Sequence, residues 1–159
     1  ITEPNLGPLF SDQAEKEDFY SGSIYILRSF SKNNYIQENR ELIHKIGFTT
    51  GEIDKRISNA KVDPTYLLAD VEVVSSYRIF NIKNSKLENL IKKIFTKKKL
   101  DITIKDRFGN PYKPEEWFLV PLDVIKDAIH KIIEGTITRY IYDPKLVKMV
   151  LINDDNLKD

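Results

Sequence analysis

Two reactive side chains, Tyr25 and Lys45, stand in short runs whose apolar residues occupy alternate positions. Tyr25 lies between Ile24 and Ile26, and Lys45 lies next to Ile46. Alternation of this kind predicts two neighbouring β-strands. A phenol and an amine can both take part in proton transfer. The first question is therefore whether these two groups line a site or merely face water.

Two further groups, Arg56 and Glu88, fall in segments with helical periodicity. A guanidinium can donate two parallel hydrogen bonds to a phosphate, and a carboxylate is a hard ligand for Mg²⁺. Each residue also has a simpler interpretation, because a glutamate in the first turn of a helix favours the helix dipole. In the same way, a tyrosine in a strand is commonly a half-buried packing residue, and a lysine in a strand is commonly exposed to solvent. Only their combination points to chemistry.

The elements that must position these groups predict an α/β (α+β) domain with a small, mostly antiparallel sheet flanked by helices. The alternation slips at Val73-Val74, which indicates either a bulge or a fully buried middle in that strand. The expected elements are strands at about 23–29, 43–49 and 70–80, a helix of about three turns from Thr50 to Ala60, a helix over 86–97 capped by Asn84-Ser85, a hairpin over 101–114, a helix from Leu122 to Glu134 that stops at Gly135, and two β-rich runs around Asp143-Pro144. Residues 30–41 are expected to form a long polar connection.

Composition restricts the class of protein. A chain of 159 residues with 41% hydrophobic and 31% charged residues fits one globular domain. There is no cysteine and there are only two histidines, so disulfides, thiolate metal sites and a structural zinc site are not expected. The net charge of +1 argues against strong sequence-independent binding to polyanions, although a local basic face remains compatible with it. No apolar run approaches the ~20 residues that span a membrane, and no signal-peptide pattern is visible, so we expect a cytoplasmic protein.

The order of motifs resembles the GIY-YIG nuclease superfamily. Ser23-Ile24-Tyr25 resembles its first motif and Lys45-Ile46-Gly47 its second, while Arg56-Ile57 and Leu87-Glu88 match the arginine and glutamate expected on the two following helices. The lysine in the second motif, together with Glu116-Trp117-Phe118, is similar to the phage- and restriction-associated branch of the superfamily. A single three-letter motif would carry little weight, but five elements in the right order are moderately specific.

The resemblance implies an endonuclease that hydrolyses DNA with one bound Mg²⁺ or Mn²⁺, as part of a larger restriction, phage or mobile-element protein. Glu88 would hold the metal, Arg56 would bind the phosphate, and Tyr25 would handle the attacking water. Lys45 is expected to assist by motif register, and His44 is the alternative, since a strand places only one of the two on the face of Tyr25. Trp117 and Phe118 are expected to be core anchors.

Three departures from the family pattern keep a second function open. Ser23 replaces a glycine, the connection from Tyr25 to Lys45 is longer than usual, and Ala60 stands where many members carry histidine or tyrosine. Tyr35-Ile36-Gln37 is a rival for the second motif, but it lacks the glycine and we reject it. The alternative function is a non-catalytic module that binds nucleic acid or another partner while keeping the fold.

DNA contacts are expected from basic residues on the second long helix and in the long connection, because such contacts position the phosphate backbone without reading sequence. These residues are Lys92, Lys93, Lys97, Lys98 and Lys99 on the first segment, and Lys32 and Arg40 on the second. We expect residues 1–21 to be a lead-in or linker, 22–120 the nuclease-like core, and 121–159 a C-terminal helix and β extension of the same domain. The low net charge suggests that targeting depends on an additional domain or subunit.

Overall fold

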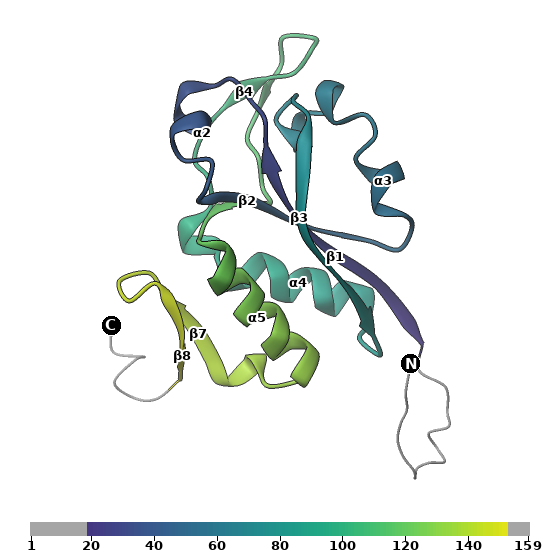
Figure 1. The fold of residues 1–159 in the computed structure, drawn as a ribbon, viewed down its shortest axis with the longest axis vertical. Coiled ribbons are helices and arrows are strands. Elements are labelled where there is room, and N and C mark those ends of the chain that lie inside the picture. Colours follow the sequence, from purple (N-terminus) through teal and green to yellow (C-terminus); the bar gives the residue numbers. More distant parts are fainter. Residues whose placement is uncertain (1–18, 153–159) are drawn as a thin grey trace.

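The computed structural model describes residues 19–152, and these residues form an α+β fold around a four-stranded antiparallel sheet (Figure 1). The strand order in the sheet is β3-β1-β2-β6. The elements follow along the chain as β1 (Tyr20–Ser29), α2 (Asn34–Glu38), β2 (Ile43–Thr49), α3 (Ile53–Arg56), η1 (Ala60–Val62), η2 (Pro64–Tyr66), β3 (Val71–Phe80), α4 (Asn84–Ile94), η3 (Thr96–Lys98), β4 (Ile104–Lys105), β5 (Pro111–Tyr112), β6 (Trp117–Leu119), α5 (Leu122–Glu134), η4 (Ile137–Arg139), β7 (Tyr140–Asp143) and β8 (Lys148–Leu151). The predicted fold class is confirmed.

Strand β1 is the centre of the sheet, and alternation along it divides the molecule into two sides. Ile24 and Ile26 enter the main core, whereas Tyr25 and Leu27 enter a smaller cluster on the opposite face. The slip predicted at Val73-Val74 is a bulge, because Ile26 pairs with Ser75 while Leu27 pairs with Val73 and leaves Val74 without a counterpart. The bulge keeps the apolar alternation of β3 matched to that of β1.

The main core lies between one face of the sheet and the helices α4 and α5. Leu87 and Ile91 of α4, and Ile125 and Ile129 of α5, are buried against the sheet residues Ile24, Ile26 and Ile46. Helix α5 has the predicted bounds, and Gly135 ends it with a left-handed φ of +80°. Helix α4 differs from its prediction. It begins at Asn84, with Lys83 as the capping residue, and its last turn gives way to η3.

The other face of the sheet is covered by irregular structure where the sequence predicts a three-turn helix. Only one turn, α3, forms, and η1 and η2 follow it. The Ser58 hydroxyl donates a hydrogen bond to the carbonyl of Lys55 at 2.9 Å, which competes with the helical bonding of this short segment. Ile53 and Ile57 nevertheless pack toward the sheet as expected. The predicted helix from Thr50 to Ala60 is therefore wrong in length and right in orientation.

The connection over residues 30–41 contains the short helix α2, which the sequence analysis did not assign. The Asn33 side chain accepts hydrogen bonds from the backbone N–H groups of Tyr35 and Ile36, and Ile36 is buried. An Asn cap followed by an apolar residue three positions later was the available signal. The chain reaches β2 through this helix rather than through an open loop.

Two hairpins, β4–β5 and β7–β8, complete the described residues and agree with the predicted β segments over 101–114 and around Asp143-Pro144. Strand β6 pairs with β2, with Lys45 opposite Trp117, so β2 lies inside the sheet. Trp117 and Phe118 are both buried, as expected of core anchors.

Within residues 19–152, no helix combines the length and the apolar character needed to cross a membrane. The lead-in over residues 1–18 and the acidic end over 153–159 lie outside the described part of the chain.

A close approach between β1 and β2 explains the glycine of the second motif. Tyr25 lies directly opposite Gly47 in the strand pairing. A Cβ atom at Gly47 would overlap ring atoms of Tyr25 and would lie 2.5 Å from its hydroxyl oxygen. The tyrosine ring therefore occupies the space that any larger residue at Gly47 would need.

Replacing Gly47 with Ala is expected to lower the free energy of unfolding by about 1–3 kcal/mol, since overpacking forces a buried ring or the backbone to move. Gly51→Ala is the matched control, because the nearest atom to its Cβ would be the Thr49 hydroxyl at 3.9 Å. Urea denaturation of the three proteins measures the difference. Equal losses in both variants would contradict the assigned contact.

Candidate active site

A small polar pocket of about 110 Å³ opens beside the Tyr25–Gly47 contact. Three of the predicted site residues, Tyr25, Arg56 and Glu88, line it together. The pocket is lined by Tyr25, Ile46, Gly47, Phe48, Arg56, Glu88, Ile91, Lys92 and Glu116. The sequence predicts one site formed by Tyr25, Lys45, Arg56 and Glu88; three of these four side chains line this pocket, Lys45 does not, and their chemical roles stay predictions.

The charged groups of the pocket come from separate parts of the chain. Arg56 is exposed at the last residue of α3. Glu88 and Lys92 are exposed on α4, one turn apart, next to the buried Leu87 and Ile91. Residues four apart share a helix face, so the packing of the apolar side of α4 sets the position of both charges. With the half-exposed Glu116, the pocket therefore presents two carboxylates and two cations beside a buried tyrosine.

The hydroxyl of Tyr25 has a defined hydrogen-bond direction. The Tyr66 hydroxyl donates to the backbone carbonyl of Arg56 at 3.2 Å. A phenol has one proton, so at the 3.2 Å contact between the two hydroxyls the oxygen of Tyr66 must accept and Tyr25 must donate. The oxygen lone pairs of Tyr25 remain free to accept a hydrogen bond from the pocket.

Burial keeps Tyr25 in its neutral form. Its side chain is almost wholly inaccessible to solvent. Desolvation raises the pKa of the Tyr25 hydroxyl far above its ordinary value of 10.0, and the hydrogen bond and charge of Tyr66 raise it further. Arg56 opposes this rise but does not overcome it. Near neutral pH, Tyr25 can hold a water molecule by accepting a hydrogen bond, and it is not a phenolate base.

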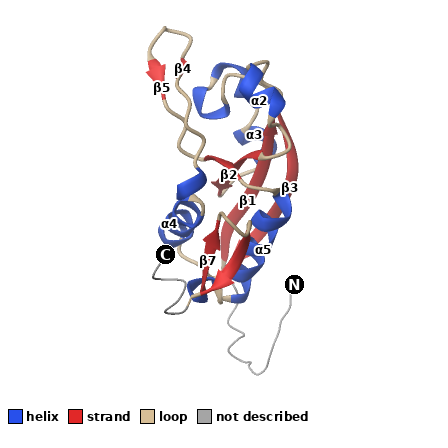
Figure 2. Ribbon diagram, turned by 90° about the vertical axis from the view of Figure 1, so that its left-hand side faces the viewer, coloured by secondary structure: helices blue, strands red, loops and turns tan. Residues whose placement is uncertain are grey.

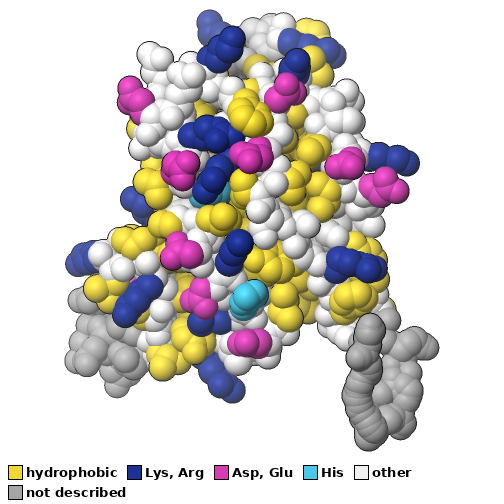
Figure 3. All heavy atoms as spheres, in the orientation of Figure 1, with side chains coloured by type: hydrophobic (Ala, Val, Ile, Leu, Met, Phe, Trp, Pro, Cys, Tyr) yellow, Lys and Arg dark blue, Asp and Glu magenta, His cyan; other side chains and the backbone are white. Residues whose placement is uncertain are grey.

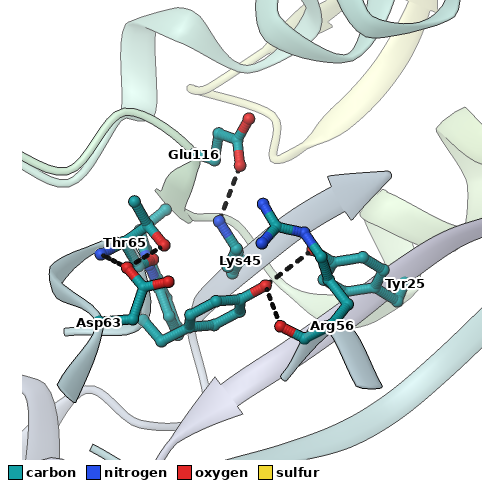
Figure 4. Close-up of polar contacts among 8 residues, drawn as sticks. Tyr25, Lys45, Arg56, Asp63, Thr65 and Glu116 are labelled. Carbon is teal, nitrogen blue, oxygen red and sulfur yellow. Dashed lines mark hydrogen bonds and ion pairs between the residues drawn. The ribbon is translucent and has the colours of Figure 1, made fainter. Parts of the chain in front are cut away.

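Tyr66 is a site residue that the sequence analysis missed. It follows Asp63, whose side chain accepts hydrogen bonds from the backbone N–H and the hydroxyl of Thr65 at 2.9 and 2.7 Å (Figure 4). The indole N–H of Trp117 donates to the carbonyl of Thr65 at 2.9 Å. The Asp63-Pro64 pair starts the 3₁₀ turn that carries Tyr66. That capping pattern was the signal available in the sequence.

Lys45 shares the face of Tyr25 but does not line the same pocket. Its Nζ atom is buried and donates to Oε1 of Glu116 at 2.7 Å (Figure 4). The ammonium group also lies 5.0 Å from the centre of the Tyr66 ring. Burial lowers the pKa of Lys45 from its ordinary 10.5, and the Glu116 carboxylate acts against that change. Lys45 lines a neighbouring hollow of about 170 Å³, which shares Arg56 and Glu116 with the first pocket.

His44, the alternative to Lys45, lies on the opposite face of the sheet and is fully buried there. Its Nδ1 atom contacts the Val120 carbonyl at 2.9 Å and its Nε2 atom accepts from Nε of Arg28 at 3.0 Å. These partners require a neutral ring with the proton on Nδ1, and burial lowers the pKa of His44 in agreement with that state. His44 does not line the pocket of Tyr25.

The predicted DNA-binding residues separate into four groups. Lys92 lines the pocket, whereas Lys93 and Lys97 line an apolar groove of about 460 Å³ beside the β7–β8 hairpin. Lys98 and Lys32 are exposed, and Lys99 pairs with Glu115 at 3.0 Å. Arg40 is held by Glu72 at 2.9 Å and stacks 4.4 Å from the Phe30 ring centre. Figure 3 shows basic and acidic side chains interspersed on one face of the molecule, with no single broad basic patch there.

The donor set of the pocket fits one hard divalent cation. Among residues 19–152, no three His, Cys, Asp or Glu side chains gather closely enough to enclose a metal by themselves. Mg²⁺ does not require such a cage, since it commonly takes one or two carboxylates and completes its shell with waters and phosphate oxygens. Glu88 is an exposed carboxylate in the pocket and can serve as that ligand.

Comparisons with known proteins identify one family. The model of the T5orf172 domain matches residues 22–133. The chain is also similar to "Uncharacterized protein YeeC" of Bacillus subtilis (strain 168), with 38% identity over 122 residues. That match covers 77% of this chain and 32% of the relative, so the chain corresponds to about a third of the relative's length. No solved structure matches the chain.

The buried Lys45–Glu116 pair leads to a stability prediction. Glu116→Gln is expected to lower the free energy of unfolding by about 1–3 kcal/mol near pH 7, because it leaves a buried ammonium without its counter-charge. Lys45→Met is expected to be neutral or stabilising, since it removes the buried charge while the half-exposed Glu116 can be hydrated. Urea denaturation of both variants measures these changes.

The sign of the pH dependence provides a second check. The pKa of Lys45 is lower in the folded chain than the 10.5 of the unfolded chain, so the energetic cost of burying the amine is full at low pH and falls as pH rises toward 10.5. The energetic cost of burying the charged amine is larger in Glu116→Gln, because the counter-charge is missing. The deficit of Glu116→Gln relative to wild type should therefore shrink between pH 7 and pH 10, and a deficit that grows over this range would refute the assignment.

Proposed function

The chain belongs to the T5orf172 domain family, which is associated with nuclease-related proteins of phages, and on this basis we propose that it is a metal-dependent endonuclease of the GIY-YIG kind that hydrolyses DNA. One observation carries the proposal. Tyr25, Arg56 and Glu88, which come from three separate elements, line one solvent-open pocket. Phosphodiester hydrolysis needs a group to orient water, a cation to bind the phosphate and a ligand for a metal, and these three side chains supply them.

Arg56 and Lys92 bind the scissile phosphate in this proposal. Both are exposed cations of the pocket, and Arg56 can donate two parallel hydrogen bonds to phosphate oxygens. Glu88 holds Mg²⁺ or Mn²⁺. When bound, the metal neutralises charge on the phosphate and on the departing oxygen. Because Arg56 is fixed by α3 and Glu88 by α4, the packing of both elements on the sheet sets their separation.

Tyr25 orients the attacking water by accepting one of its hydrogen bonds. Its own proton is directed at Tyr66, and the Tyr66 proton is directed at a backbone carbonyl. An amide carbonyl oxygen is not a base at neutral pH, so the chain of hydroxyls cannot carry a proton away. The proton released by water must therefore leave by another route, through the solvent-open side of the pocket.

A second candidate function is a nucleic-acid-binding module without hydrolytic activity. The observation that favours it is the state of Lys45, which stands at the position of the second-motif tyrosine but is buried and paired with Glu116. For either function, we propose that targeting depends on an additional domain or subunit, since the net charge is only +1.

Glu88→Gln is expected to reduce plasmid nicking in Mg²⁺ or Mn²⁺ by about 100-fold or more, because it removes the negative ligand while keeping the size of the side chain. Glu134→Gln, at the exposed end of α5, is the matched control and should nick as wild type does. Cleavage by wild type that EDTA abolishes and Glu88→Gln lacks would support the endonuclease. Binding to DNA without any cleavage would favour the second candidate, and equal nicking by Glu88→Gln would indicate another site or a contaminant.

Tyr66→Phe tests the direction of the Tyr25 hydroxyl. The variant keeps the ring but removes the acceptor, so Tyr25 can donate into the pocket and the water loses a fixed partner. We expect kcat to fall about tenfold or more with little change in KM, since only the positioning of water is affected. Tyr142→Phe, on the β7–β8 hairpin, is the control for loss of a buried hydroxyl elsewhere. A rise in KM without a change in kcat would contradict the proposed role.

A further inference from the structure

The β4–β5 hairpin projects from the body of the molecule (Figure 2). It joins residues 104–112 through a short turn, and Ile104 pairs with Tyr112. At its base, Ile102 and Ile104 pack against the buried cluster that contains Trp117 and Leu100. The hairpin is therefore anchored in the fold at one end and reaches into solvent at the other.

The tip of this hairpin is held in one conformation by its own hydrogen bonds. The Asp106 carboxylate accepts from the backbone N–H groups of Phe108 at 2.9 Å and Asn110 at 2.8 Å. The backbone of Asp106 also exchanges hydrogen bonds with Asn110 and Gly109, at 2.8 and 2.9 Å. Gly109 adopts a left-handed φ of +85°, which the turn requires. A turn with this many internal bonds is preorganised rather than loose.

This rigid tip holds an aromatic ring in water. Phe108 is 75% exposed. The Arg107 guanidinium lies 5.0 Å from the Phe108 ring centre, and Lys105 is exposed on the strand below. Exposure of an aromatic ring to water is not favourable in free energy. The cation beside the ring is a group that can pair with phosphate. The tip thus combines a stacking surface with positive charge.

The base of the hairpin meets the candidate site. Tyr112 lines the hollow that also includes Lys45, Arg56 and Glu116. Burial raises the pKa of Tyr112, and the nearby Glu116 carboxylate adds to the rise, which agrees with this placement. A strand rises about 3.3 Å per residue, and Asp106 already bonds to Asn110 across the turn, so the paired part of the arm extends roughly 7 Å beyond Ile104 before the turn. That length corresponds to about two nucleotide steps along one DNA strand, and the turn adds to it.

We propose that the β4–β5 hairpin is a DNA-binding arm, in which Phe108 contacts bases near the cleaved bond while Arg107 and Lys105 contact the flanking phosphates. A two-stranded ribbon fits a DNA groove, and exposed apolar side chains are used against bases in several modes of DNA recognition. This inference rests on the proposed DNA substrate. It adds to that function a second contact surface outside the pocket.

DNA suits this surface better than a protein partner. The tip carries Lys105 and Arg107, and its one acidic side chain, Asp106, is occupied by the hydrogen bonds of the turn. A single aromatic ring on a narrow hairpin offers too little area for a stable protein interface, which buries about 800 Å² on each partner. One ring is sufficient to contact bases of a duplex, because single apolar side chains such as Phe can insert between base steps from a groove.

The test compares two hairpin tips of this chain. Phe108→Ala and Arg107→Ala alter the proposed arm. Leu146→Ala and Lys145→Ala are matched controls on the β7–β8 hairpin, where Leu146 is 59% exposed and Asp143 accepts from the backbone N–H groups of both residues. Fluorescence anisotropy measures the affinity of each protein for a labelled ~30-base-pair duplex in EDTA, which prevents cleavage. Thermal unfolding checks that all four variants fold.

We expect Phe108→Ala to weaken duplex binding about tenfold and Arg107→Ala to reduce the slope of log affinity against log salt by about one. The two control variants should bind as wild type does. Wild-type affinity in Phe108→Ala, or equal losses in Phe108→Ala and Leu146→Ala, would overturn the arm and leave the endonuclease proposal intact if Glu88-dependent nicking persists. A wild-type protein that neither binds nor nicks DNA would overturn both.

Discussion

The contact between the Tyr25 ring and the backbone of Gly47 is the constraint on which the candidate site depends. Because Gly47 has no side chain, the ring can lie across β2 at the point where the two strands pair. From there the Tyr25 hydroxyl reaches Tyr66 on one side and the pocket on the other. The elements on the two faces of the sheet meet at this place, with α3 supplying Arg56 and α4 supplying Glu88 (Figure 1).

An ion pair between the buried Lys45 and the half-exposed Glu116 lies next to the pocket. Lys45 carries its charge inside the sheet and has one carboxylate partner, Glu116, which also lines the pocket. A buried ammonium destabilises a fold unless it is paired. The ion pair with Lys45 therefore fixes the position of Glu116. The segment before β6, which carries Glu116, is thereby coupled to β2. The pocket wall and the hollow under the β4–β5 arm share this residue.

Sequence reasoning located the side chains that periodic elements carry. Tyr25 and Glu88 lie on a strand and a helix whose apolar patterns are regular, so their faces could be inferred. It failed between Thr50 and Ala60, where only one helical turn forms and the Ser58 hydroxyl bonds to the Lys55 carbonyl. Tyr66, on the short turn η2, was missed as a site residue, and Glu116 was noted only as part of a motif. Only the packing of distant segments brings them to Tyr25 and Lys45.

The sequence by itself determined that His44 and Lys45 face opposite sides of a strand, because side chains alternate with a period of two. It also determined α5, whose apolar period and final glycine require no distant partner. Only the tertiary structure decided which residue of the pair shares the side of Tyr25. The register that places Gly47 opposite Tyr25 puts Lys45 opposite Leu27, on Tyr25's face. Register depends on the partner strand, and a shift of one residue would have exchanged the two side chains.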